Sequence, residues 1–114
     1  MKISHSQMAA MGWLHFIDRM IDLLRAGFPE KVAALTTEEL QAGIREQGER
    51  AGKYGLVNEQ DVAIFVLTAW FLGAGFGERI PAVTEKLNDA SLTPGEKAQW
   101  LESFSRSLFE ALER

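Results

Sequence analysis

The longest apolar run lies in the middle of the chain, from Val62 to Phe76, and Thr68 is its only polar side chain. An amphipathic surface helix would show polar positions on one face, so this run predicts a helix covered by protein on all sides. Asn58 is a suitable N-cap, and Gly73 a suitable end. The run of fifteen residues would span about 22 Å, less than the hydrocarbon layer of a membrane. The sequence therefore predicts a central core helix and no membrane span.

The first helix is predicted over residues 6–27, with apolar side chains in two neighbouring rows. Both rows have the three- and four-residue spacing of a helix face. The first row contains Ala10, Trp13, Leu14, Ile17, Ile21, Leu24 and Phe28, and the second contains Phe16, Met20 and Leu23. Roughly two thirds of the helix surface is apolar, more than the outer helix of a small bundle needs. We therefore expect this helix to need more cover than the domain provides.

The remaining segments also favour helices. A short turn is predicted over 29–35, a helix over 37–54, a glycine turn over 74–77, a short helix over 82–87 and a last helix after Thr93. Thr with Glu three residues later, a capping-box pattern, begins the second long helix and the last one. No segment shows the alternation of strands. The predicted fold is all-α: one domain over residues 1–114, a single compact bundle of four to five helices around a central apolar helix.

Composition narrows the function classes. The chain has 46% hydrophobic and 25% charged residues, as globular proteins do. The absence of cysteine excludes disulfides, thiol catalysis and Cys-ligated metals. A formal charge of -4 and a pI near 5.2 argue against nucleic-acid binding, which needs clustered basic residues. The N-terminal segment has no clean apolar run of the kind a signal peptide needs, so we expect a cytoplasmic protein.

The sequence offers little for catalysis. His15, Asp18 and Asp22 share one side of the first helix, but no second cluster completes a metal site. The glycines of 73–77 follow a helix, whereas phosphate loops follow a strand and open a helix. No serine lies in a nucleophile-elbow pattern. We expect no catalytic residue, no cofactor and no bound metal.

Apolar residues on the first helix are the better candidates for function. The three tryptophans lie on different predicted helices, and Trp is enriched at the energetic centres of protein interfaces. Both the first and the central helix require cover beyond one face. We therefore predict that Trp13, Phe16, Met20 and Leu23 bind a protein partner, with a homodimer as an alternative to a heteromeric complex.

Two blocks of sequence resemble a known family. The first contains Tyr54-Gly55-Leu56, Glu59, Asp61-Val62, Phe65, Leu72-Gly73 and Phe76, and the second contains Leu87-Asn88-Asp89, Leu92-Thr93 and Glu96-Lys97. Together, over residues 28–101, they resemble small helical proteins encoded beside bacterial type VI secretion effectors. The chain departs from that pattern after Phe76, where Gly77 replaces a frequent Asp, and after Pro81, where Ala82-Val83 replace an early aromatic residue.

The resemblance implies an accessory role without catalysis. It implies a cytoplasmic co-chaperone or adaptor that, with a larger dedicated chaperone, holds an effector and helps to load it onto the secretion spike. The alternative is an immunity protein that blocks a toxin's active site with acidic residues such as Glu38, Glu39 or Glu59. An enzyme that uses His15 and Asp22 is the third hypothesis.

Overall fold

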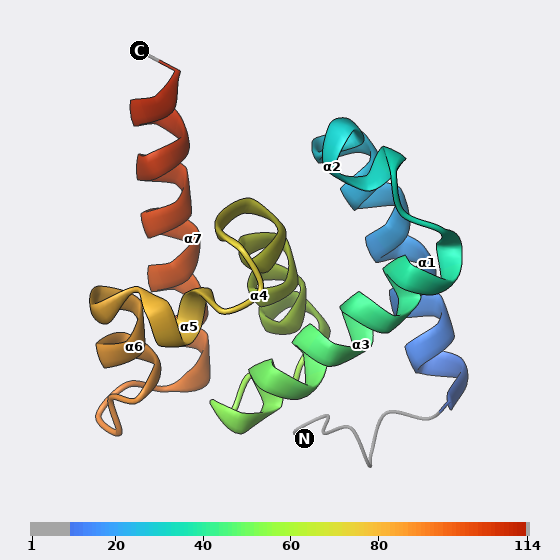
Figure 1. Ribbon diagram of the computed structural model, residues 1–114. Helices are drawn as coiled ribbons and strands as arrows, with labels where there is room; N and C mark the ends of the chain where they lie inside the picture. The colour runs from blue at the N-terminus through green and yellow to red at the C-terminus, as the bar shows by residue number, and fades with distance from the viewer. Residues whose placement is uncertain (1–9, 114) are drawn as a thin grey trace.

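The computed structural model of the chain describes residues 10–113. This part contains seven helices and no strand (Figure 1), which confirms the predicted all-α class. The helices are α1 (Ala10–Gly27), α2 (Pro29–Ala33), α3 (Thr37–Lys53), α4 (Glu59–Leu72), α5 (Phe76–Arg79), α6 (Pro81–Leu87) and α7 (Pro94–Leu112). The four long helices form the predicted bundle, and α2, α5 and α6 are short connecting helices. The predicted start of the first helix at residue 6 lies outside the described residues.

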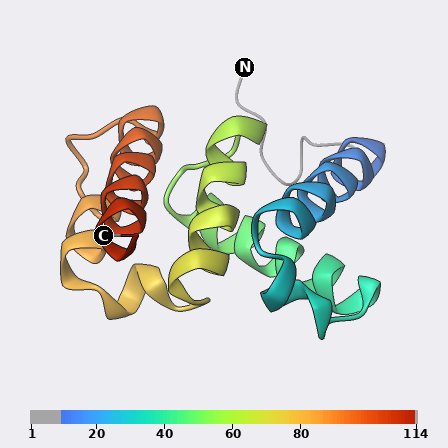
Figure 2. The same ribbon diagram turned by 90° about the horizontal axis from the view of Figure 1, so that it is seen from above.

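Helix α4 is the centre of the bundle. It lies between α1 and α7 when the molecule is seen from the front and from above, and α3 crosses it (Figures 1 and 2). The Phe65 side chain of α4 is buried, with its ring centroid 4.8 Å from that of Phe76 and 6.0 Å from that of Tyr54. Leu24 of α1, Ile44 of α3 and Leu101 of α7 are also fully buried in this core.

The helix starts follow the sequence signals. The hydroxyl of Thr36 accepts a hydrogen bond from the backbone N–H of Glu39, and the Glu39 carboxylate accepts one from the N–H of Thr36. Thr93 and Glu96 make the same pair of bonds at the start of α7. These bonds satisfy N–H groups that have no partner inside the helix. Both predicted capping boxes are therefore confirmed.

Gly73 ends α4 as predicted, and Gly55 ends α3 in the same way, but the segment after α4 differs from the prediction. Gly55 has φ +84° after α3, and Gly73 has φ +105° after α4. The predicted turn through Gly77 is wrong in its second half, because residues Phe76–Arg79 form one helical turn. The Arg79 N–H donates to the Gly75 carbonyl at 3.0 Å. Phe76 is buried against the core, and this packing favours the helical turn in spite of the glycines.

The domain is thin. Its principal extents are 40 × 33 × 19 Å, and the smallest matches two layers of helices of about 10 Å each. Two layers cannot cover a helix on every side, and Ile64, Leu67 and Phe71 of α4 are only half-buried. The prediction that protein covers α4 completely is therefore wrong on this side of the helix.

The start of α4 gives a testable pH dependence. Asp61 is buried there. The side-chain Oδ1 of Asn58 accepts a hydrogen bond from the backbone N–H of Asp61 at 2.8 Å, and the side-chain Nδ2 of Asn58 donates one to the Asp61 carboxylate at 3.0 Å. Burial raises the pKa of Asp61 above its ordinary 3.8, and the bond from Asn58 lowers it in part. The folded state therefore binds the Asp61 proton more tightly than the unfolded state does. Protonation of Asp61 stabilises the fold below pH 3.8, and this stabilisation is lost as the pH rises through the raised pKa.

We expect the free energy of unfolding of the wild type, relative to that of Asp61→Asn, to fall as the pH rises across this range. Urea unfolding of both proteins at several pH values measures the difference. A difference that stays constant or increases with pH would contradict the account.

Candidate functional site

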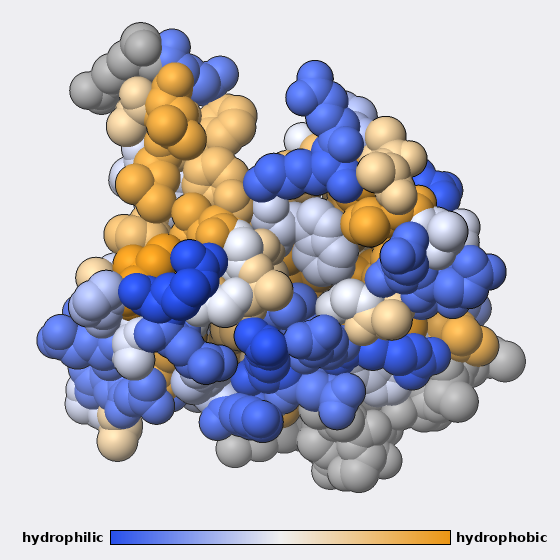
Figure 3. Space-filling view, viewed as in Figure 1, coloured by the Kyte–Doolittle hydropathy of each residue, from blue (hydrophilic) through white to orange (hydrophobic). Residues whose placement is uncertain are grey.

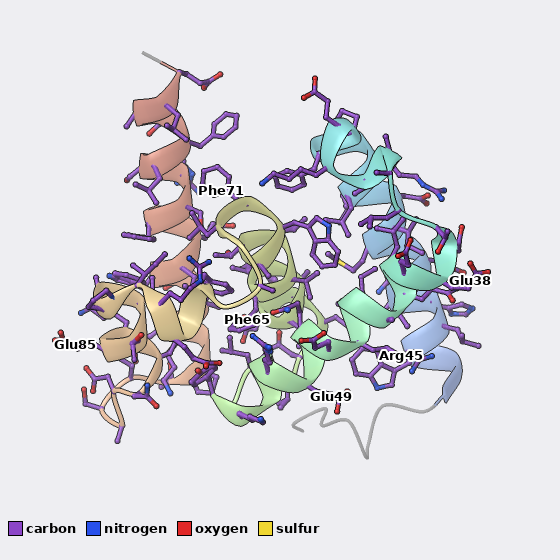
Figure 4. The ribbon with its side chains drawn as sticks, in the orientation of Figure 1. Glu38, Arg45, Glu49, Phe65, Phe71 and Glu85 are labelled. Carbon is purple, nitrogen blue, oxygen red and sulfur yellow. The ribbon has the colours of Figure 1, made fainter. Side chains whose placement is uncertain are left out.

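A long groove runs along the exposed side of α4, between the end of α1 and α7. Its volume is about 400 Å³, and we call it the α4–α7 groove. The lining residues are Gly27, Phe28, Ile64, Leu67, Thr68, Phe71, Glu102, Ser105, Arg106 and Phe109. Figure 4 shows Phe71 between α4 and α7, where its ring centroid lies 5.9 Å from that of Phe109. The floor of the groove is the side of α4 that the two helix layers leave uncovered.

The polar groups of the groove are bonded to one another. The Thr68 hydroxyl donates to the Ile64 carbonyl at 2.7 Å and lies 3.4 Å from the Ser105 hydroxyl. The Arg106 guanidinium donates to Glu102 at 3.3 Å, in a pair four residues apart on α7. These polar groups therefore do not require a polar ligand. The groove is suited to apolar side chains.

The last two turns of α7 extend the apolar surface. Phe109 is 52% exposed and Leu112 is 77% exposed, three residues apart on neighbouring turns of one helix. Figure 3 shows hydrophobic side chains along this end of α7, beside the notch that separates it from α2. Because the two side chains are neighbours and adjoin the apolar groove, they form a contiguous apolar surface with it, and such surfaces mark binding sites more often than single exposed side chains do.

On the side of the groove that faces α7, Lys31 holds α2 and Phe28 in place. Its ammonium group donates to the carbonyls of Trp70 at 2.6 Å and Phe71 at 3.3 Å, and it lies 5.6 Å from the centre of the Phe28 ring. The last carbonyls of a helix have no partner inside the helix. Lys31 therefore ties α2 to the end of α4 and holds Phe28 at the groove.

The structure corrects the predicted partner surface on the first helix. The chain itself buries Trp13, Phe16 and Met20, and the rings of Trp13 and Phe16 pack edge to face at 5.7 Å. The prediction that these three side chains are surplus is wrong, because they pack into the core that α1 forms with α3 and α4. Leu23 is exposed, and whether it contacts a partner stays a prediction.

A second groove runs between α1 and α4, near the start of α4. Phe16, Met20 and Leu23 line it together with Ala63. Arg19 and Glu59 form an ion pair of 2.7 Å between the two helices. Exposed pairs of this kind contribute little to stability. Three of the four residues predicted from the sequence are therefore brought together here, two of them as the buried floor.

The other sequence candidates do not form one site: Asp22 and Glu59 line the second groove, whereas Glu38 and Glu39 lie at the start of α3. His15 and Asp22 are exposed on α1. Glu38 lies at the outside of the molecule (Figure 4), and Glu39 is held in the capping box of α3. Within residues 10–113, no three acidic, histidine or cysteine side chains are grouped so that they could hold a metal ion.

A third cavity lies between α2, α3 and the end of α4. Its volume is about 370 Å³, and we call it the Gln47 pocket. The lining residues are Lys31, Leu35, Glu39, Gly43, Glu46, Gln47, Ala69, Trp70 and Ala74. Gln47 is 3% exposed, and its buried Oε1 atom has no hydrogen-bond partner among the described residues. An unpaired buried acceptor costs about 1–3 kcal/mol, so this oxygen is unusual.

Sequence reasoning missed the α4–α7 groove. Leu112 follows Leu101, Phe104 and Leu108 at the three- and four-residue spacing of one helix face, and this spacing by itself indicates a buried side chain. Phe109 lies beside that row and next to Glu110, and an aromatic side chain on the polar side of a helix was the available signal. Gln47 stands in the apolar row of its helix, at three- and four-residue spacing from Ile44 and Ala51. Its position therefore indicated a buried side, although glutamine itself is mostly exposed in proteins.

Within the described part of the chain, no helix is both long and apolar enough to cross a membrane. Comparison of the chain with protein-family models, curated proteins and solved structures gives no match.

Proposed function

We propose that this protein is a non-catalytic binding module that receives an apolar helix of a partner protein in the α4–α7 groove. One observation supports this most strongly: the groove is open, its side chains are mainly apolar, and its polar groups are bonded to one another. Helical partners commonly bind such grooves through apolar residues spaced three and four apart. The exposed Phe109 and Leu112 lengthen the contact beyond the groove.

The partner that we propose is a secretion effector or its dedicated chaperone. In this role the protein is a co-chaperone or adaptor that helps the chaperone to hold a type VI effector for loading. The support for this role is the resemblance of the two sequence blocks within residues 28–101. The groove supports the binding of a polypeptide and is equally suited to an effector helix and to a chaperone helix.

The test uses two variants at equally exposed positions. Phe109→Glu places a charge at the groove, whereas Leu14→Glu places the same charge on α1; both side chains are 52% exposed in the wild type. Each variant is co-expressed with the products of the neighbouring effector and chaperone genes, and the affinity of the recovered complex is measured. We expect Phe109→Glu to weaken binding by about thirtyfold or more, as for an interface hot spot, and Leu14→Glu to change it less than about twofold.

A third variant, Leu23→Glu, tests the one exposed residue of the partner surface that was predicted on the first helix. Loss of binding in Leu23→Glu with full binding in Phe109→Glu would overturn the groove as the binding surface.

The biological role has its own test. If deletion of the gene kills cells only when the effector is an active toxin, the protein is an immunity protein and the adaptor role is wrong.

A further inference from the structure

We propose that the Gln47 pocket binds the side chain of an arginine from a partner polypeptide. The pocket is separate from the α4–α7 groove, so the result for one site does not decide the other. The argument starts from the oxygen of Gln47, which is buried, belongs to a residue that lines the cavity, and lacks a hydrogen-bond donor within the described chain. The ligand must therefore carry an N–H or O–H group.

One wall of the pocket is suited to a flat donor. The Trp70 indole packs against the backbone of α3 at Gly43, and a Cβ atom on Gly43 would lie 2.9 Å from the ring. Only glycine therefore allows the ring to lie this close to the helix. Planar guanidinium groups stack on indole rings and present several N–H donors in one plane.

The charges around the pocket favour a cation. Glu39 forms no ion pair with a basic side chain of residues 10–113, and its carboxylate accepts a hydrogen bond from the backbone N–H of Thr36. Arg50 is bonded to Glu46 at 3.0 Å and to the Ala74 carbonyl at 2.8 Å, and lies 3.9 Å from Glu78.

Lys31 is bonded to the end of α4, whose terminal carbonyls carry partial negative charge. Three carboxylates, Glu39, Glu46 and Glu78, and this helix end therefore outweigh the two basic groups Lys31 and Arg50.

The experiment uses three small probes on the full-length protein. Nα-acetyl-arginine amide has a planar, positively charged side-chain group. The citrulline analogue has a planar group without the charge, and the lysine analogue has a positive charge on a group that is not planar. Binding is followed by NMR on the indole N–H signal of Trp70, with those of Trp13 and Trp100 as internal references. We expect a saturable shift at Trp70 with the arginine probe, and at least about fivefold weaker binding of the other two.

The decisive variant is Gln47→Leu, which removes the acceptor. We expect it to fold at least as stably as the wild type, because an unpaired buried oxygen is replaced by an apolar group, and to bind the arginine probe about tenfold more weakly. The control is Gln99→Leu, on an exposed part of α7, which should bind as the wild type does. Gly43→Ala, which pushes a methyl group against Trp70, should also weaken binding.

Three results would overturn the proposal: no saturable shift at Trp70, equal binding of the arginine and lysine probes, or unchanged binding by Gln47→Leu. A Gln47→Leu protein that is clearly less stable than the wild type would show that the oxygen has a structural role, and would also overturn it.

Discussion

Replacing Phe65 with alanine lowers the free energy of unfolding by about 3–5 kcal/mol. The side chain is almost fully buried on α4, and its ring packs against those of Tyr54 and Phe76. Alanine removes the ring and leaves a cavity that the surrounding helices can close only in part. Since domains of this size are stabilised by only about 5–15 kcal/mol, we expect a large decrease in the urea midpoint.

The matched control is Leu112→Ala, which also truncates a large apolar side chain but at a position that is 77% exposed. We expect its stability to lie within about 0.5 kcal/mol of the wild type, as for most surface substitutions. Equal losses in the two variants would contradict the assignment of Phe65 to the core and of Leu112 to the surface.

Replacing Gly73 with alanine should lower the free energy of unfolding by about 1–3 kcal/mol. The residue has φ +105° and ψ 152°, a backbone conformation that is essentially restricted to glycine. An added Cβ atom would also lie 2.5 Å from the guanidinium of Arg79, which donates a hydrogen bond to the Leu72 carbonyl. The substitution therefore strains the backbone and displaces a side chain that binds the end of α4.

Gly27→Ala is the control, because it makes the same chemical change with the opposite expected sign. Gly27 ends α1 without a positive φ, and a Cβ atom there would have no neighbour within 4 Å. Alanine reduces the freedom of the unfolded chain, so we expect a gain of about 0.4–1 kcal/mol. Thermal or urea unfolding of both variants tests the pair. If Gly27→Ala is less stable than the wild type while Gly73→Ala is equally stable, this explanation of the two glycines is wrong.

The candidate binding surface lies on different helices from those that the sequence predicts. From the sequence, the partner surface was expected on α1, at Trp13, Phe16, Met20 and Leu23. In the structure, Phe16 and Met20 are buried, whereas Phe71 and Phe109 lie at the open groove. The candidate binding surface is therefore mainly on α4 and α7, and it does not include the four residues of α1 that were predicted from the sequence.

The sequence by itself determined where the helices begin and end. Thr36, Asn58 and Thr93 cap the helices that follow them, and Gly55 and Gly73 end the helices before them. These features depend on hydrogen bonds and dihedral angles within a few residues, so local sequence is sufficient to predict them.

Only the tertiary structure decided which apolar side chains form the core and which line a groove. The three- and four-residue spacing tells which side of a helix is apolar, but not whether another helix covers it. That cover depends on how α1, α3 and α7 cross α4, and the contacts involved join residues far apart in the chain, such as Phe71 and Phe109. Gln47 stands in the apolar row of α3 between Ile44 and Ala51, so the spacing by itself indicates a buried side. Only the tertiary structure shows that its side-chain oxygen has no hydrogen-bond partner among the described residues.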